Sequence, residues 1–193
     1  MERGRVQTML ESKLQFIPLN QLSYEQHAQL LNIRNLKSIR DMMSDAKEIG
    51  LNEHLAWADK YGCNTKQCYY ALKNTDQIIG GINCTDIIAS ECSWGIYIKP
   101  NIEVGLASFA TYLFLKHLFE KKEMELIWAK VRRINPKTLR FNESFGFTCK
   151  REDEEFYYLE LTKEAWQERS NSRLFQTLMK RYKNTTYQFM ENS

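Results

Sequence analysis

Three β-type segments follow one another between residues 66 and 100, and they constrain the fold more than any other part of the chain. The segments 66–74 and 77–88 flank the turn residues 74–76, and this pattern predicts a β-hairpin. The segment 91–100 continues the hairpin as a meander and stops at a proline. We therefore expect an antiparallel sheet at the centre of the fold.

The residues before this meander predict one strand and two helices. Residues 14–19 have the apolar content of a strand. Ser23 opens the segment 23–35 and is followed three residues later by glutamine, which is the capping-box pattern of a helix start. Residues 52–62 predict a second helix, with an asparagine as N-cap and a glycine as its end.

The residues after the meander alternate between helix and strand. Residues 105–122 have apolar side chains at helical spacing, and residues 124–133 read as a strand. Residues 135–147 begin with an asparagine N-cap and a proline at the first helical position, which predicts a helix, and residues 154–162 predict a final strand. We expect a mixed α/β fold: one mostly antiparallel sheet with a single parallel crossover and helices on both faces.

Composition limits the class of protein. The chain has 193 residues, 43% of them hydrophobic and 26% charged, which suits one soluble domain. No apolar run approaches the roughly 20 residues of a membrane-spanning helix, and residues 1–13 lack the apolar core of a secretory signal. The five cysteines are scattered without a C-x-x-C pair, which argues against a disulfide framework or a zinc site. We expect a cytoplasmic protein that binds no membrane.

The net charge of +3 is too small to require a nucleic-acid partner, and we expect none. Six Lys or Arg and three Glu lie between Lys163 and Ser193, so the tail carries much of the excess. We assign residues 1–162 to the main domain and 163–193 to a basic, helical C-terminal extension. The extension is either a solvated helix face or a contact for a partner.

The junction "WGIYIKPNIEVGLAS" (94–108) has the features of a ligand site. Gly95 within a strand indicates a bulge or a close backbone approach. Gly105 allows a tight turn into the next helix, whose first residues then offer free N–H groups. A helix N-terminus favours phosphate because it combines these donors with a partial positive charge. The alternative is an ordinary strand–turn–helix connection without a ligand.

The order of elements, the junction 94–108 and "NPKTLRFNESFGF" (135–147) together resemble the GNAT superfamily of acetyl-CoA-dependent N-acetyltransferases. The resemblance covers residues 14–162. Within it, "IRNLKSIRDMMSDAKEIGLNEHLAW" (33–57) is similar to the bacterial acetyltransferases that modify nucleotide-linked amino sugars in the pseudaminic-acid pathway. The resemblance implies a GNAT-like acyl-CoA acyltransferase fold, acetyl-CoA as co-substrate and no metal.

The resemblance also implies which residues contact acetyl-CoA. They are Gly95, Ile96, Tyr97, Ile98, Val104, Gly105, Leu106, Ala107, Ser108, Asn135, Thr138 and Asn142. On the coenzyme side, one loop and one residue depart from the family pattern. The loop 101–108 keeps only one glycine, and Asn142 replaces a tyrosine that often protonates the leaving thiolate in the family.

On the acceptor side, the resemblance implies contacts from Arg34, Arg40, Met43, His54 and Trp57. The two arginines suit a substrate diphosphate, and surface ion pairs are the alternative. Met43 and Trp57 suit an apolar wall for a deoxy-sugar or nucleobase, and core packing is the alternative for Trp57.

The candidate catalytic residues are Asn142, His54 and Glu91. Asn142 can donate a hydrogen bond to cofactor or thiolate but no proton at neutral pH. A thiol has a pKa of about 8.5, so its thiolate can leave without obligatory protonation. His54 and Glu91 are the remaining bases, because Lys130 stands where some relatives carry a carboxylate. His54 is alternatively a packed or solvated histidine.

The leading hypothesis is acetyl transfer from acetyl-CoA to the amino group of a nucleotide-linked deoxy-amino-sugar, by direct attack of the amine. The first alternative is a ribosomal-protein-type protein N-terminal acetyltransferase. The second is a non-catalytic domain that binds acetyl-CoA or a partner through its basic tail. The expected ligands are small molecules, and the expected assembly is a monomer or a homodimer.

Overall fold

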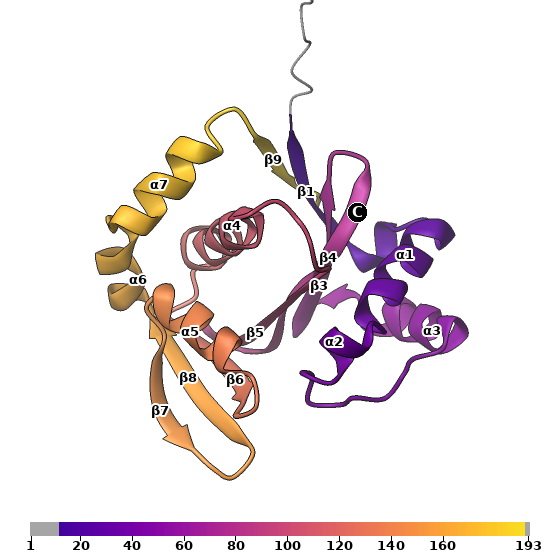
Figure 1. Cartoon of the computed structure of the whole chain (residues 1–193), viewed down its shortest axis with the longest axis horizontal. Coiled ribbons are helices and arrows are strands. Elements are labelled where there is room, and N and C mark those ends of the chain that lie inside the picture. Colours follow the sequence, from indigo (N-terminus) through magenta and orange to yellow (C-terminus); the bar gives the residue numbers. More distant parts are fainter. Residues whose placement is uncertain (1–11, 192–193) are drawn as a thin grey trace, which may run out of the picture.

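The computed structural model describes residues 12–191, which form one curved sheet flanked by helices (Figure 1). The strands are β1 (Lys13–Pro18), β2 (Cys63–Asn64), β3 (Gln67–Asn74), β4 (Gln77–Ile88), β5 (Glu91–Ile98), β6 (Leu126–Arg132), β7 (Thr148–Glu152), β8 (Phe156–Thr162) and β9 (Thr186–Phe189). The helices are η1 (Leu19–Gln21), α1 (Tyr24–Arg34), α2 (Lys37–Arg40), α3 (Leu51–Tyr61), α4 (Leu106–Glu120), α5 (Pro136–Ser144), α6 (Lys163–Ser170) and α7 (Arg173–Arg181). Of residues 1–13, which were expected not to form a secretory signal, residues 1–11 lie outside the described residues.

The strand order is β7-β8-β6-β5-β4-β3-β1-β9, and β2 pairs with β3. The β5–β6 pair is parallel, as the crossover through α4 requires, and so is the pair of β1 with β9. The other pairs are antiparallel. The expected mixed α/β fold with a mostly antiparallel sheet is confirmed.

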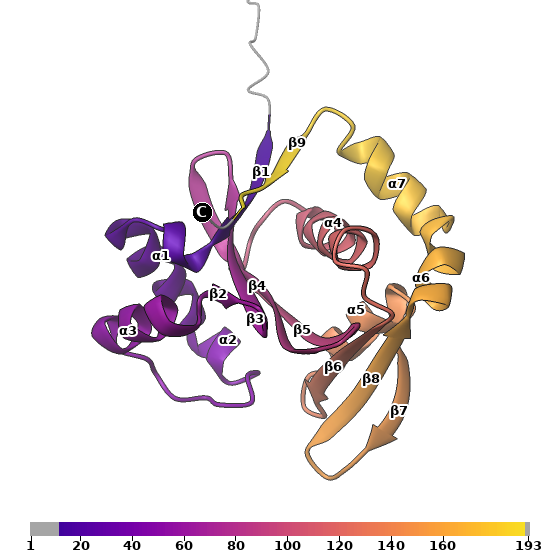
Figure 2. The same ribbon diagram turned by 180° about the vertical axis from the view of Figure 1, so that it is seen from behind.

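Helices cover the sheet on both faces (Figures 1 and 2). α1, α2 and α3 lie on one face, and α4 lies on the other with α5, α6 and α7 around it. The larger apolar core surrounds α4, in which Phe109 and Phe114 are fully buried. A smaller core lies under α1 and α3 and includes Leu30 and Ala58. The sheet therefore separates two packed layers, and residues on opposite faces of β5 reach different layers.

Two helix starts follow the predicted capping pattern. The Ser23 side chain accepts a hydrogen bond from the Gln26 backbone N–H, and the Gln26 side chain accepts one from the Ser23 N–H. Asn135 caps α5 in the same way, since its Oδ1 accepts from the Thr138 N–H. The prediction that Asn52 is the N-cap of α3 was wrong. The cap is Gly50, whose carbonyl accepts from the His54 N–H and closes the first turn earlier.

The sequence missed β7 and β9. All five residues of β7 are exposed, so no apolar alternation marks this edge strand, which forms by pairing with β8. β9 lies in the tail that was expected to be helical throughout. It pairs with β1 from the far end of the chain, and Phe189 stacks on Phe16 with ring centroids 4.0 Å apart. Local propensity carries no information about such a distant partner.

The glycine in β5 permits a close approach and not a bulge. The β4–β5 register runs without a break from the Gly80–Ile98 pair to the Thr85–Ser93 pair. A Cβ atom on Gly95 would lie 3.2 Å from Oδ1 of Asn83, its cross-strand partner. The register shift in this ladder lies further on, between Thr85 and Ile88. The prediction of a bulge at Gly95 was therefore wrong. The structure instead agrees with the alternative prediction, a close approach to the Gly95 backbone.

The structure bears on two expectations that came from composition, one about membrane helices and one about cysteines. No helix within residues 12–191 is long and apolar enough to cross a membrane. Cys84, Cys92 and Cys149 are free thiols, whereas Cys68 is disulfide-bonded. The argument from scattered cysteines therefore fails for Cys68. Spacing in the sequence could not show it, because strand pairing decides which residues meet.

Candidate active site

The two faces of β5 lead to two different environments. Trp94, Ile96 and Ile98 belong to the core around α4, whereas Tyr97 packs with the smaller core under α1 and α3. This follows from the two-residue period of a strand. Of the residues expected to hold acetyl-CoA, Tyr97 therefore directs its side chain toward the opposite face of the sheet from α4.

β5 and β6 separate part-way along β5. Their ladder has three pairs, Glu91–Leu126, Cys92–Ile127 and Ser93–Trp128, and β5 continues to Ile98 beyond the last of them. The backbone of residues 94–98 is paired with β4 on one side and has no β6 partner within the described residues on the other. Free main-chain donors and acceptors on the β6 side of β5 can therefore pair with a ligand.

The first turn of α4 follows this separation. Gly105 has φ +91°, the left-handed conformation that glycine adopts without strain. Within residues 12–191, the N–H groups of Ala107 and Ser108 have no acceptor. Leu106 is different, because its side chain is buried in the core and its N–H donates to the Glu103 carbonyl. Of the expected contacts in this turn, Leu106 therefore has no group to offer a ligand.

Asn142 is placed differently from the expected thiolate donor. Its side chain is 2% exposed, and its Nδ2 donates to the Thr138 carbonyl at 2.8 Å. The carbonyl fixes the amide orientation, since it can only accept. The remaining atom, Oδ1, is buried without a partner in the described part of the chain. Oδ1 accepts hydrogen bonds, so it suits an amide N–H or a thiol S–H and not a thiolate.

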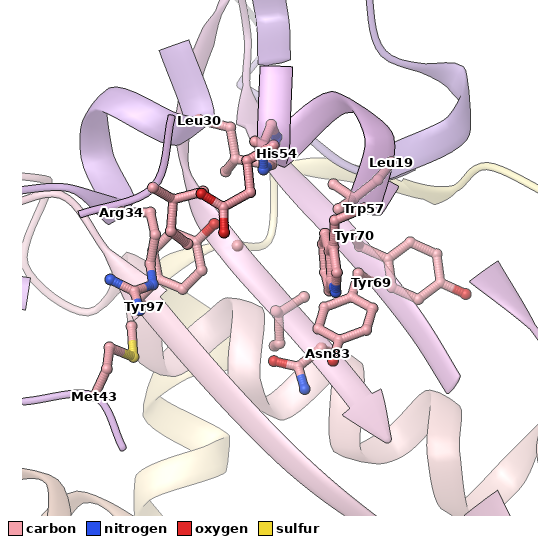
Figure 3. A pocket seen from close by; sticks show the side chains of 14 residues that line it. Leu19, Leu30, Arg34, Met43, His54, Trp57, Tyr69, Tyr70, Asn83 and Tyr97 are labelled. Carbon is pink, nitrogen blue, oxygen red and sulfur yellow. The ribbon is translucent and has the colours of Figure 1, made fainter. Parts of the chain in front are cut away.

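A cavity of about 380 Å³ lies on the α1–α3 side of the sheet. Residues from η1, α1, α3, β3, β4 and β5 line it, together with Met43 and Ile49 from the connection between α2 and α3. Figure 3 shows Arg34, Met43 and Tyr97 on one side and Trp57, Tyr69 and Asn83 on the other. Four of the five residues expected on the acceptor side therefore meet here: Arg34, Met43, His54 and Trp57.

The two arginines differ. Arg34 lines the cavity, its Nη2 donates to the Asp45 carbonyl at 2.8 Å, and its Nη1 is buried without a partner in the described part. Burial lowers the pKa of this guanidinium, but an arginine remains charged. Arg40 does not line the cavity and forms an ion pair of 2.7 Å with the exposed Glu48. For Arg40, the structure therefore agrees with the alternative prediction, a surface ion pair.

His54 is one half of a buried histidine pair. Its Nε2 lies 3.1 Å from Nδ1 of His27, so one of these two ring nitrogens donates a hydrogen bond to the other. Burial, with repulsion from His27 second, lowers the pKa of His54 to about 4, so the ring is neutral and only a weak base at pH 7.

Tyr69 and Asn83 were missed by the sequence analysis. They are cross-strand partners in the β3–β4 hairpin, so their side chains share a face. The Tyr69 ring packs edge-on against Trp57, with centroids 4.6 Å apart. The signal was present in the hairpin register, because a correct pairing of 66–74 with 77–88 places both residues on the face of α3.

Gly81 gives the floor of the cavity its shape. A Cβ atom there would lie 2.7 Å from Cζ of Tyr97, its cross-strand partner on β5. The glycine thus lets the Tyr97 ring lie flat on the sheet. Burial raises the pKa of the Tyr97 hydroxyl, which stays protonated.

The connection between α2 and α3 is held to the body by side chains. Nη1 of Arg132, on β6, donates to the carbonyls of Asp41 at 2.9 Å and Met43 at 3.5 Å. Asn35 exchanges two hydrogen bonds with the backbone of Ile49. These bonds connect β6, on one side of the strand separation, to the segment that lines the cavity. They hold Met43 in the wall of the cavity.

Glu91 does not join the other candidates. It is exposed at the start of β5, and its Oε2 accepts from Nε1 of Trp128 at 3.3 Å. At about 3.3 Å per residue, it lies about 20 Å along the strand from Tyr97. A carboxylate at that distance cannot take a proton from an amine bound in the cavity.

The acetyltransferase (GNAT) domain family matches residues 19–148, which span the cavity, the strand separation and α5. The chain belongs to this family. The chain is therefore an acetyltransferase that takes its acetyl group from acetyl-CoA.

Two kinds of relatives were found for this acetyltransferase. Acetyltransferase PseH of Campylobacter jejuni subsp. jejuni serotype O:23/36 (strain 81-176) is 30% identical over 126 residues, which are 65% of this chain and 79% of PseH. The crystal structure of Campylobacter jejuni PseH in complex with acetyl coenzyme A superposes with a TM-score of 0.63 at 26% identity, covering 77% of this chain and 98% of the other. Apo FdhC, described as a nucleotide-linked sugar GNAT, has a TM-score of 0.68 over 83% of this chain and 91% of its own, and its 17% identity shows the fold alone.

Proposed function

We propose that this acetyltransferase moves the acetyl group of acetyl-CoA to the amino group of a nucleotide-linked deoxy-amino-sugar. The observation that carries the proposal is the cavity on the α1–α3 side. It combines aromatic and apolar walls with one cationic side chain, that of Arg34, whose Nη1 is buried and lacks a partner within the described residues. An acceptor that is partly apolar and carries a phosphate fits both features.

The proposed division of roles follows the two faces of the sheet. Acetyl-CoA binds where β5 and β6 separate, with its pyrophosphate at the Ala107 and Ser108 amides and its pantetheine arm along residues 94–98. Oδ1 of Asn142 accepts from the arm or from the product thiol. The acetyl group then reaches the cavity through the separation. Trp57 and Tyr69 form the wall against which the sugar or base packs.

The proposed chemistry is direct attack. The neutral amine nitrogen forms a bond with the thioester carbonyl carbon, the carbonyl becomes an oxyanion, and the C–S bond then breaks to release CoA thiolate. A backbone N–H of Ile96 or Tyr97 on the free side of β5 stabilises the oxyanion, an effect of about 10²–10³ in rate. The amine proton leaves through water, because His54 with a pKa of about 4 is too weak a base to hold it.

The cavity chemistry supports a sugar-nucleotide acceptor over other amine acceptors. A polyamine needs carboxylates, and among residues 12–191 the charged groups that line the cavity are Arg34 and one carboxylate, Glu53. A protein N-terminus needs an open groove, whereas the aromatic rings of Trp57, Tyr69, Tyr70 and Tyr97 line this cavity. The similarity to PseH and the likeness of residues 33–57 to the pseudaminic-acid-pathway enzymes also support a sugar nucleotide. Such a reaction belongs in the cytoplasm.

Thiol release with acetyl-CoA tests the proposal directly. The acceptors to compare are a UDP- or CMP-linked 4-amino sugar, the corresponding free amino sugar, spermidine and a peptide with a free N-terminus. We expect the highest kcat/KM for a sugar nucleotide. Turnover of the peptide or spermidine without turnover of any amino-sugar nucleotide would contradict the proposed acceptor.

A further inference from the structure

The C-terminal extension, residues 163–191, is part of the folded core. Trp166, Phe175, Leu178 and Tyr182 are buried against the α4 layer, and Phe175 packs on Tyr112 of α4 with ring centroids 4.8 Å apart. In both views α6 and α7 pass along the outer side of α4 before β9 returns to β1 (Figures 1 and 2). The extension therefore encloses the helix whose first turn is assigned to the coenzyme pyrophosphate.

The end of α7 contacts the loop that leads into α4. The Tyr182 ring stacks on Phe109 at 4.5 Å, and its hydroxyl donates to the Val104 carbonyl at 3.1 Å. Arg181 forms an ion pair of 3.4 Å with Glu103. Burial raises the pKa of Tyr182 to about 12, so the hydroxyl keeps the proton that it donates. Arg181 and Tyr182 lie outside residues 19–148, over which the family matches, whereas their partners lie inside them.

The hydrogen bond to Val104 fixes the orientation of one peptide group. In a trans peptide the C=O and the next N–H point in opposite directions. With its carbonyl directed at Tyr182, the Val104–Gly105 peptide directs the Gly105 N–H away from the extension. A flip of this peptide would change φ of Gly105 from +91° to about −90°, which glycine also adopts freely. The backbone alone therefore does not decide which group faces outward.

We propose that Tyr182 is a positioning residue for acetyl-CoA: it holds the Val104–Gly105 peptide so that an N–H, and not a carbonyl oxygen, faces the coenzyme pyrophosphate. Arg181 assists by neutralising Glu103, a carboxylate in the same loop that would repel the phosphates. The inference rests on the proposed placement of acetyl-CoA at the first turn of α4.

Binding of acetyl-CoA to the full chain by isothermal titration tests this without an acceptor. Tyr182→Phe keeps the stack on Phe109 and removes only the hydroxyl. We expect its Kd for acetyl-CoA to rise about three- to tenfold, the effect of one hydrogen bond. Tyr187→Phe is the matched control, since Tyr187 is an exposed tyrosine of the same extension with no side-chain hydrogen bond in the described part. Its Kd should change less than about twofold.

A purely structural role gives a different result. Tyr182→Phe would then lower the Tm while the Kd for acetyl-CoA, measured well below the Tm, equals that of the wild type, and this would overturn the inference. If the wild-type chain itself binds no acetyl-CoA, the proposed coenzyme site fails instead.

The charge pair gives a second arm that leaves the Tyr182 side chain itself unchanged, although the Arg181 guanidinium carbon lies 5.8 Å from the centroid of the Tyr182 ring. Arg181→Gln leaves Glu103 unneutralised and should raise the Kd about two- to threefold at low salt, with less effect at high salt. Adding Glu103→Gln should restore the wild-type Kd. A double variant that binds as weakly as Arg181→Gln alone would refute the role of Arg181.

Discussion

Replacing Arg34 by glutamine is the sharpest test of the acceptor cavity. In the free protein, Nη1 of Arg34 is buried without a partner within residues 12–191, and Nη2 is bound to the Asp45 carbonyl. The donor is therefore already desolvated and oriented before a substrate arrives. A hydrogen bond to a charged group contributes about 1.5–3 kcal/mol, which corresponds to a factor of about 10 to 150. We expect kcat/KM for a sugar nucleotide to fall by that factor in Arg34→Gln.

The assay is thiol release at saturating acetyl-CoA, with the sugar nucleotide and the free amino sugar as parallel acceptors. Because the free sugar has no phosphate, its kcat/KM should change little in Arg34→Gln. Arg40→Gln is the matched control: its ion pair with exposed Glu48 lies away from the cavity and contributes at most about 1 kcal/mol. Equal losses for both acceptors, or a larger loss in Arg40→Gln than in Arg34→Gln, would refute the reasoning.

Two further predictions concern pH and shape. Burial, with Lys122 and Lys121 contributing less, lowers the pKa of His117 from the ordinary value of 6.5 to about 4, so the unfolded chain binds the proton first as the pH falls. The contribution of His117 to the free energy of unfolding should be fully present above pH 6.5 and should be lost toward pH 4, a decrease of about 3 kcal/mol. Urea unfolding of His117→Phe should show a smaller decrease in stability over this pH range than the wild type. Identical pH profiles of the two proteins would contradict the prediction. Gly81→Ala should push the Tyr97 ring into the cavity and raise the acceptor KM at least about tenfold with little change in acetyl-CoA Kd, whereas Gly50→Ala, with nothing within 4 Å, should not; equal acceptor KM values would count against the cavity as the acceptor site.

The elements with strong local signals were predictable. The capping box at Ser23, the cap at Asn135 and the apolar periodicity of α4 each depend on residues a few positions apart, and the structure has them. β7 and β9 carry no such signal. Their pairing is decided by β8 and by β1 respectively, so the local sequence could not identify them.

The sequence could predict which residue types belong to the candidate site, but not how these residues are arranged. Residues 33–57 predicted an acceptor site, and Arg34, Met43, His54 and Trp57 do line one cavity. The sequence could not separate Arg34 from Arg40, because both have the same chemistry and only the fold gives Arg40 its partner Glu48. For the same reason it offered Glu91 as a base, although strand direction places it far from the cavity.

By itself the sequence determined the order of those strands and helices that carry strong local signals, the strand–turn–helix junction and the family, since these depend on periodicity, caps and motifs within short windows. Only the tertiary structure decided which groups are left free to act. In the folded chain, Nδ2 of Asn142 donates to a backbone carbonyl and burial lowers the pKa of His54. Tyr182 of the extension donates a hydrogen bond to the Val104 carbonyl. Each of these depends on atoms brought together across the sheet or along the outside of α4, and distance in the chain gives no measure of that proximity.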